Sequence, residues 1–437
     1  MKKSIPVLFD LALFFPVICL IAMGIVFIFS SGINSSGIQV SNEFIKQIIF
    51  ASVGVIWMII ASLVDYRKLY RYTPYAFGAL GALLLYTAFF GRYVNGAKSW
   101  LGIGEFGVQP SEFGKIVFIL FFAWFLDKSA GLADRQRFII ALCILIAPLI
   151  LILLQPDLGT ASVYIPIFLV MCFFAGIPIR YLILVILSGS LMLVLALLPI
   201  WETEIVRKTY PVLLILRNDK IRLIVIVAAG SITVVGFIGR LISKRGYYYW
   251  ISYAFGIITF ALASSMVVRR VLKDYQMKRL IVFLNPDSDP RGAGWNIIQS
   301  KIAIGSGGIF GQGFLRGTQS HYRFLPQQST DFIFSILSEE WGFAGCAAVF
   351  VLMLIVLTRT LFIIKNTTNI FGSYIASGIF GMFFYHFIIN VGMVMGLMPI
   401  TGIPLLFLSY GGSALWTAML CAGILMGINH RKLDFGF

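Results

Sequence analysis

Charged side chains are scarce in this sequence: only 12% of its 437 residues are charged, whereas 59% are hydrophobic. The mean hydropathy is +0.93. A soluble core cannot bury this much apolar surface, so the composition excludes a soluble globular protein. Many of the apolar runs are long enough to cross a bilayer. The sequence therefore predicts an all-α polytopic membrane protein.

Cysteine and histidine are also few, with five and three residues respectively. The cysteines fall inside apolar runs without paired spacing, which excludes a disulfide framework and indicates small core residues. The histidines, His321, His386 and His430, lie too far apart in the predicted topology to form a cluster. Neither residue type indicates a metal site.

No nucleotide-binding motif is present. The glycine-rich segment 305–313 does not follow a strand and lacks the Lys-Ser/Thr pair of a phosphate-binding loop, so we expect no nucleotide or organic cofactor. Two interpretations stay open for this segment. It is either a structural scaffold or a set of backbone N–H groups that hold a diphosphate near Lys301, Arg316 and Arg323.

Acidic residues are outnumbered by basic ones, 18 to 34, which gives a formal net charge of +16. In a soluble protein this excess of positive charge would suggest that the protein binds nucleic acid. Here the basic residues gather in short loops between apolar runs, where they act as a topology signal, so we expect no nucleic-acid partner. These loops fall on one side when the spans alternate. The prediction is a multi-pass protein of the cytoplasmic (inner) membrane with both termini inside.

Apolar runs of about 17–25 residues, the length that a bilayer requires, predict about 12 transmembrane helices. The first run shows no cleavage site, so we expect an uncleaved helix. The runs lie at roughly residues 8–30, 46–64, 73–90, 113–126, 138–154, 158–175, 181–200, 221–242, 248–268, 331–357, 370–395 and 402–428.

These runs divide the chain into four parts. Residues 1–200 form the N-terminal helices, with a re-entrant outer loop near 91–112. Residues 201–268 add a loop and two helices. Residues 269–330 form a large extracytoplasmic loop, and 331–437 form the last three transmembrane helices. The basic run at 269–279, within the large loop, fits either an interfacial anchor or a collar for anionic lipid head groups.

The segment from 285 to 341 concentrates glycines, amides and hydroxyls between two apolar spans, which makes it the best place for chemistry. Asp331 lies where the next span begins. The structural alternative is that Asp331 caps that helix. Ser329 and Thr330 would cap equally well, and this redundancy favours a chemical role for the acid.

Other polar residues interrupt spans on the same predicted side. Trp100, in the 91–112 loop, fits an interfacial belt residue. Ser111 is predicted to cap the following helix, which places Glu112 and Lys115 on one face of its first turn. An acid and a base there are costly unless they are paired or used.

Asp157 follows a proline at another helix junction. Polar residues at broken helices are a common way to build membrane sites. The simpler interpretation is that Asp157 caps the helix that follows it.

Five sequence blocks resemble the SEDS (shape, elongation, division and sporulation) family, its elongation branch more than its divisional branch. They are GAKSWLGIGEFGVQPSEFGKI, LQPDLGT, NPDSDPRGAGWNIIQSKIAIGSGGIFGQGFLRGTQS, FLPQQSTDFIFSILSEEWG and NVGMVMGLMPITGIPLLFLSYGGSA. The blocks are colinear and span nearly the whole chain. The family has ten transmembrane helices, so the pair within 201–268 is expected to be an insertion.

The resemblance implies a peptidoglycan glycosyltransferase that polymerises lipid II into β-1,4-linked glycan, with its active site facing outside. It implies a class B penicillin-binding protein, a transpeptidase, as partner, together with other proteins of the elongation complex. Asp331 matches the family's catalytic acid and Trp100 an important residue of the first outer loop. Glu112, Lys115 and Asp157 match polar positions of the family's central cavity.

The implied chemistry needs a base for the acceptor hydroxyl and positive charge for the departing diphosphate. Asp331 is the candidate base, and one carboxylate suffices because an α-linked donor that gives a β-linkage reacts with inversion. Candidate diphosphate partners are Lys115, Lys301, Arg316 and Arg323. A divalent cation, Mg or Mn, bridging Asp331 and the phosphates fits this chemistry.

Two other classes of function stay open. A flippase or transporter of lipid II predicts cargo-binding charges at mid-depth and no single outer acid. A non-enzymatic scaffold of the elongation machinery needs neither cargo-binding charges nor a catalytic acid. Charges grouped at the outer surface favour the enzyme over the flippase, and the intramembrane charges argue against the scaffold.

Overall fold

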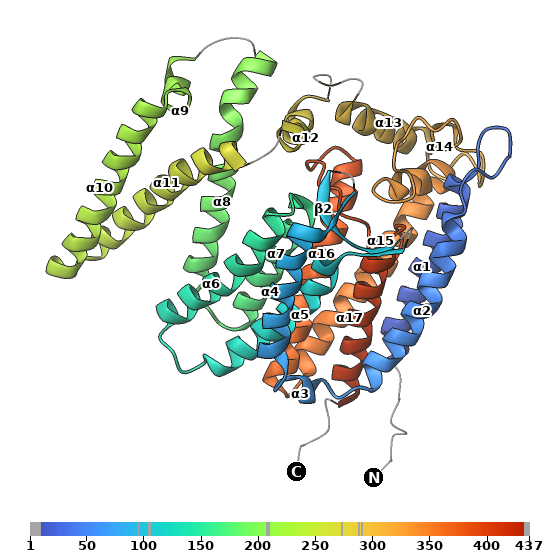
Figure 1. Ribbon diagram of the computed structural model, residues 1–437, viewed down its shortest axis with the longest axis horizontal. Coiled ribbons are helices and arrows are strands. Elements are labelled where there is room, and N and C mark those ends of the chain that lie inside the picture. The colour runs from blue at the N-terminus through green and yellow to red at the C-terminus, as the bar shows by residue number, and fades with distance from the viewer. Residues whose placement is uncertain are drawn as a thin grey trace. The chain divides into compact units, whose positions relative to one another are not determined.

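The computed structural model describes residues 10–431 apart from 95, 104, 105, 207–209, 272, 273, 287, 288, 290 and 291. The described chain is almost entirely helical and contains one three-stranded sheet (Figure 1). It divides into two compact units. Unit 1 comprises Met1–Ile177 and Asn296–Phe437, and unit 2 comprises Pro178–Trp295.

Ten helices in the described ranges are long and apolar enough to cross a membrane. They are α1 (Leu11–Ser31), α2 (Glu43–Leu63), α4 (Thr73–Phe90), α6 (Asp134–Leu153), α8 (Ile179–Ile200), α10 (Asp219–Ser243), α11 (Gly246–Val271), α15 (Ile333–Asn366), α16 (Ile370–Val394) and α17 (Gly412–His430). The helix α7 (Leu158–Phe174) is apolar but shorter, and α5 (Pro110–Lys128) carries more charge. Each predicted span overlaps one of these helices, whereas twelve crossings stay a prediction.

The remaining elements are short and lie mostly between these helices. They are α3 (Tyr66–Leu69), β1 (Arg92–Val94), β2 (Ala97–Ile103), β3 (Phe106–Val108), a π-helix (Trp201–Val206), a 3-10 helix (Pro211–Leu213), α9 (Leu214–Arg217), α12 (Asp274–Leu284), α13 (Ala293–Ser306) and α14 (Thr318–His321). Most side chains of the basic run at 269–279 lie outside the described residues.

The core of unit 1 is built around α16 and α17, the most buried of its apolar helices. Helix α17 packs along α2, whereas α16 packs against α7 and α15. Small residues bring α2 and α17 close together, as transmembrane helices commonly do. A Cβ at Gly423 would lie only 2.3 Å from the carbonyl oxygen of Met58. The last predicted span, 402–428, is wrong at its start, because residues 395–411 form an irregular loop before α17.

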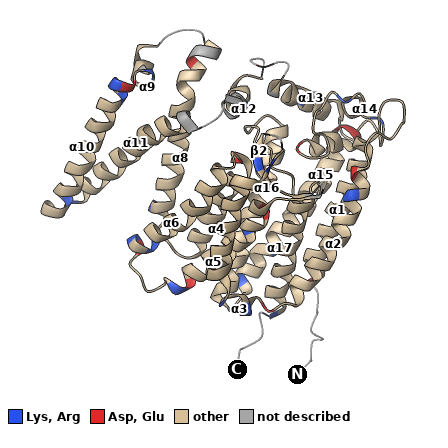
Figure 2. Ribbon diagram, in the orientation of Figure 1, with Lys and Arg blue, Asp and Glu red and all other residues tan. Residues whose placement is uncertain are grey.

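Unit 1 has two polar ends, and Figure 2 shows most of its charged residues near them. At one end, Asp10 accepts hydrogen bonds from Asn429 (2.8 Å) and Arg359 (2.9 Å), which joins α1, α17 and α15. At the other end lie the small sheet and α14 (Figure 1). There the amide of Ser35 donates to the carbonyl oxygen of His321 at 3.1 Å. Which of the two ends faces outside stays a prediction.

In unit 2 the antiparallel helices α10 and α11 pack on each other, and α11 also packs on α8. Small residues permit the close approach, since a Cβ at Gly236 would lie 3.1 Å from the amide of Ser252. The buried Arg222 donates to the carbonyl oxygen of Leu262 at 3.2 Å and to the hydroxyl of Ser265. The predicted extra pair corresponds to α10 and α11, while the compact unit is wider than 201–268.

Helix α15 is broken at Gly342, whose φ of 60° and ψ of −157° are not helical. The first half, 333–341, is buried up to Glu340, whereas the second half, 343–366, is long enough to span a bilayer by itself. A break leaves backbone carbonyl and N–H groups without intrahelical partners. In a membrane such groups need partners from the protein.

The glycine-rich segment 307–313 supplies those partners. Its amides at Gln312 and Gly313 each donate at 3.0 Å, to the carbonyl oxygens of Glu339 and Glu340. In return, its carbonyl oxygens at Gly308 and Ile309 accept from the amides of residues 343 and 344. The segment therefore has a structural role, because its backbone satisfies the hydrogen-bonding groups that the helix break leaves open. This role favours the scaffold interpretation over a diphosphate-binding loop.

Replacing Gly342 by Ala is expected to destabilise the protein by at least about 2 kcal/mol, because the side chain would strain a glycine-only backbone conformation. The new Cβ would also lie 2.3 Å from the amide nitrogen of Gly311. The matched control is Gly305→Ala in α13, where a Cβ meets nothing within 4 Å. Thermal unfolding in detergent compares the two variants. Equal stability of the two variants would contradict the structural role of the contact between Gly342 and the segment 307–313.

Candidate active site

The predicted re-entrant loop near 91–112 is an antiparallel meander in the order β1–β2–β3. Trp100 lies on the central strand and pairs with Arg92. Its ring packs over the backbone of Gly107, where an added Cβ would lie 2.9 Å from the ring. The dipeptide Asn95-Gly96 is a strong hairpin signal that explains why strands form instead of irregular backbone.

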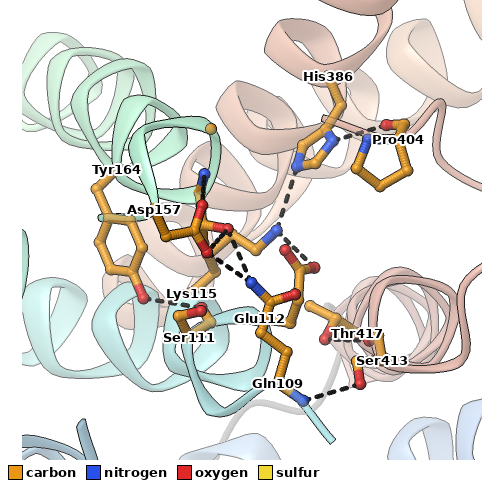
Figure 3. A network of polar contacts seen from close by, with 12 residues as sticks. Gln109, Ser111, Glu112, Lys115, Asp157, Tyr164, His386, Pro404, Ser413 and Thr417 are labelled. Carbon is orange, nitrogen blue, oxygen red and sulfur yellow. Dashed lines mark hydrogen bonds and ion pairs between the residues drawn. The ribbon is translucent and has the colours of Figure 1, made fainter. Parts of the chain in front are cut away.

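Glu112 and Lys115, one turn apart on α5, form the predicted ion pair, with 2.7 Å between the Lys115 ammonium and a Glu112 carboxylate oxygen. Glu112 is 3% exposed and Lys115 is fully buried. The ammonium also lies 3.2 Å from Nε2 of His386 on α16, a contact that the sequence interpretation missed (Figure 3). Lys115 is therefore already paired, and it is not exposed for a diphosphate.

The hydrogen bonds determine the tautomer of His386. Its Nδ1 lies 3.0 Å from the carbonyl oxygen of Pro404. Because a carbonyl only accepts, Nδ1 carries the ring hydrogen, and Nε2 accepts from Lys115. The result is a continuous buried chain from the Glu112 carboxylate to the Pro404 carbonyl.

Asp157 caps α7, as the simpler interpretation predicted: its side chain accepts from the amide of Thr160 at 3.0 Å. It also accepts from the side-chain amide of Gln109 at 2.6 Å, which links α7 to the start of α5 (Figure 3). The predicted cap at Ser111 is wrong. Helix α5 begins at Pro110, a residue preorganised for the first helical position, and its N-cap residue is Gln109.

Asp331 lies half-buried at the entrance to α15. The N-cap residue of that helix is Phe332, with no side-chain cap, so capping does not account for Asp331. The backbone around the acid is held from outside its own helix. Its carbonyl oxygen accepts from the side-chain amide of Asn390 at 3.0 Å, and that of Ser329 accepts from the amide of Tyr410 at 2.8 Å.

The remaining basic candidates, Lys301, Arg316 and Arg323, are exposed at the end of unit 1 that holds α14. None of them belongs to the buried chain that ends at Pro404, as far as the described contacts show. Their exposure leaves them accessible to a charged ligand, in contrast to Lys115.

A second buried charged cluster was not predicted. Glu339 accepts from the amide of Gln319 at 2.7 Å, and Glu340 accepts from the hydroxyl of Ser30. His321 lies 3.5 Å from Glu340. The neighbouring Glu340 carboxylate raises the pKa of His321 above its ordinary value, although burial opposes the shift. The sequence signal for this cluster was the adjacent acids Glu339 and Glu340 inside the predicted span 331–357.

No group of three or more His, Cys, Asp or Glu side chains suited to a metal ion occurs among the described residues. An all-protein metal cage is therefore not seen in this part of the chain. Mg²⁺ is often bound instead by one or two carboxylates together with substrate phosphates. The single acid Asp331 fits that second arrangement.

Comparison with known proteins assigns this architecture to a family. The model of the FtsW/RodA/SpoVE family, described as cell cycle proteins, matches residues 11–210 and 209–433. The chain is 53% identical over 425 residues to peptidoglycan glycosyltransferase RodA of Treponema pallidum, covering 97% of this chain and 98% of that protein. It is 33% identical to peptidoglycan glycosyltransferase MrdB of Escherichia coli K12 over 383 residues, covering 87% and 84%.

A solved structure shares the fold. It describes the structural coordination of polymerization and crosslinking by a peptidoglycan synthase complex, and one of its chains matches with a TM-score of 0.68 and 25% identity. The match covers 98% of this chain and 99% of that one. With a family model that matches nearly its whole length and relatives this similar, the chain belongs to the FtsW/RodA/SpoVE family.

Proposed function

We propose that this chain is a peptidoglycan glycosyltransferase that polymerises lipid II into β-1,4-linked glycan during cell-wall elongation. The observation that carries the proposal is the 53% identity, over nearly the full length, to a protein named for this activity. The second support is the acid Asp331 at a polar end of unit 1, where Asn390 donates to its carbonyl oxygen and Tyr410 donates to the carbonyl oxygen of Ser329.

Asp331 is the proposed general base. It removes the proton of the acceptor hydroxyl as that oxygen attacks the anomeric carbon of the donor, and the lipid diphosphate departs. Inversion needs no second carboxylate as nucleophile. The exposed Lys301, Arg316 and Arg323 are the proposed partners of the diphosphate. Trp100 lies in the small sheet at the same end of unit 1.

A divalent cation, Mg or Mn, is proposed at Asp331. The carboxylate would supply one ligand and the diphosphate oxygens of the substrate would supply others, a division that Mg²⁺ sites commonly show. Such an ion would neutralise charge on the leaving group.

The proposed partner is a class B penicillin-binding protein that crosslinks the new strands, within a larger elongation complex. The support is the structural relative described as a complex that coordinates polymerization with crosslinking. The proposed location is the cytoplasmic membrane with the Asp331 end outside, because the basic loops of unit 1 at α3 and between α5 and α6 lie at the opposite end of that unit (Figures 1 and 2).

Transport of lipid II is the second candidate, and the buried ion pair bears on it. A flippase needs mid-depth charges that can receive a head group. Lys115, which is fully buried, is instead satisfied by Glu112 and His386. This arrangement favours the enzyme.

The direct test is polymerisation of fluorescent lipid II by the purified protein, with glycan products resolved by gel and digested by a muramidase. We expect muramidase-sensitive chains, and faster synthesis when the penicillin-binding partner is added. A protein that moves lipid II between leaflets of vesicles but makes no glycan would support the transporter instead.

Orientation is tested with single cysteines introduced into a variant from which the native cysteines have been removed. Tyr322 and Leu132 suit this test because both side chains are exposed. We expect Tyr322→Cys to react with a membrane-impermeant maleimide in intact cells, and Leu132→Cys only after the membrane is opened. The reverse pattern would place the proposed active site in the cytoplasm.

A further inference from the structure

The side-chain amide of Asn390, on α16, joins two irregular chain segments. Its nitrogen donates to the carbonyl oxygens of Asp331 (3.0 Å) and Ile403 (2.8 Å). Asn390 itself is fully buried. Because both acceptors are carbonyls, the nitrogen must face them. One amide group therefore sets the spacing between the candidate base and the 395–411 loop.

This arrangement carries a cost. With the nitrogen so placed, the amide oxygen of Asn390 is buried without a hydrogen-bond partner among the described residues. An unsatisfied buried acceptor costs about 1–3 kcal/mol. An apolar side chain such as leucine would fill the space without that cost. What asparagine adds is the pair of donors directed at Asp331 and Ile403.

His386 repeats the arrangement one helical turn earlier on the same face of α16. Its ring holds the carbonyl of Pro404, next to Ile403, and its other nitrogen accepts from Lys115. The buried ion pair Glu112–Lys115 is thereby connected to the same loop. Two consecutive carbonyls of the loop are thus fixed from α16.

The loop is also tied to the segment before Asp331. The amide of Tyr410 donates to the carbonyl of Ser329 at 2.8 Å. Within the loop, the amide of Leu405 donates to the hydroxyl of Ser409 at 2.8 Å, and the carbonyl of Ser409 accepts from Gln47 of α2 at 3.1 Å. The loop is therefore attached to α2, to α16 and to the backbone that carries the acid.

We propose that Asn390 and His386 are positioning residues: together they clamp residues 403–404 and the backbone of Asp331, and so hold the carboxylate in its reactive place. The proposal rests on the proposed glycosyltransferase activity with Asp331 as base. It assigns the buried pair Glu112–Lys115 to this clamp, through His386, and not to contact with substrate. Displacement of a catalytic group by about 1 Å can cost on the order of 100-fold in rate, so such a clamp has a large effect.

The test uses Asn390→Leu, which keeps the branched shape of the side chain and removes both donors. In lipid II polymerisation by the purified protein with its partner, kcat should fall at least tenfold while KM changes less than threefold. The decisive measurement is the double variant Asn390→Leu/Asp331→Asn, assayed with radiolabelled lipid II. It should be no slower than Asp331→Asn alone, because a residue that acts through the carboxylate has nothing left to position.

A second pair of variants keeps the proposal testable if Asn390→Leu fails to fold. His386→Gln retains a donor for Pro404 and an acceptor for Lys115, whereas His386→Leu retains neither. We expect His386→Gln to retain most of the kcat that His386→Leu loses. Like Asn390→Leu, His386→Leu should cause no further loss when it is combined with Asp331→Asn.

The outcomes separate this proposal from the proposed function. If Asp331→Asn polymerises at the wild-type rate, the assignment of the base fails. If Asp331→Asn is slow but the Asn390 and His386 variants multiply its loss, or leave kcat unchanged, the clamp is wrong while the glycosyltransferase stands.

Discussion

Asp331→Asn is expected to reduce lipid II polymerisation by at least ~100-fold, the low end for loss of a general base. The substitution keeps the size of the side chain and removes both the base and any cation ligand. The bond from Asn390 is preserved, because it is made to the backbone carbonyl of residue 331. Thermal stability and lipid II binding should therefore change little, and the loss should appear in kcat.

Ser329→Ala is the matched control, two residues away. The contact that fixes this residue is made by its carbonyl oxygen, which the substitution leaves in place. The rate per folded molecule should stay near wild type. Near wild-type polymerisation by Asp331→Asn would instead direct the search for the base to Asp157 or Glu112.

Lys115→Met is expected to destabilise the protein by ~3–5 kcal/mol, because it leaves the carboxylate of a buried ion pair without its partner. Glu112 is 3% exposed, so water cannot replace the ammonium. His386 loses the hydrogen bond to its Nε2 at the same time. Thermal and denaturant unfolding in detergent measure the loss.

The double variant Glu112→Gln/Lys115→Met removes both charges and should recover most of that stability. Breaking one side of a buried pair costs far more than replacing both sides with neutral groups. If the single and double variants are equally unstable, the loss comes from packing and not from the uncompensated charge.

The transmembrane helices could be predicted because apolar length alone identifies them. The pair Glu112–Lys115 and the cap at Asp157 were predictable for a similar reason, since each depends on residues within one turn of helix. The cap at Ser111 was wrong because the proline before it begins the helix. The meander around Trp100 was missed because its turn signal was overlooked.

The contacts between distant segments could not be predicted. His386 is 271 residues from Lys115 along the chain, and Asn390 is 59 residues from Asp331. No local pattern reports which helices become neighbours, so these two residues looked like isolated polar groups in an apolar span. The cluster of Glu339, Glu340 and His321 was missed for the same reason.

The break at Gly342 also bears on how the protein is made. A membrane insertion machine selects apolar segments, and acidic residues at the centre of a segment oppose insertion by about 2.5–3.5 kcal/mol each. Glu339 and Glu340 lie in the first half of α15, so the second half, 343–366, is the segment that can enter the bilayer directly. We therefore expect the half-helix behind Asp331 to dock later, once α1 provides Ser30 and the segment 307–313 is in place. In this order of events, the surroundings of the acid would assemble after the spans have been inserted.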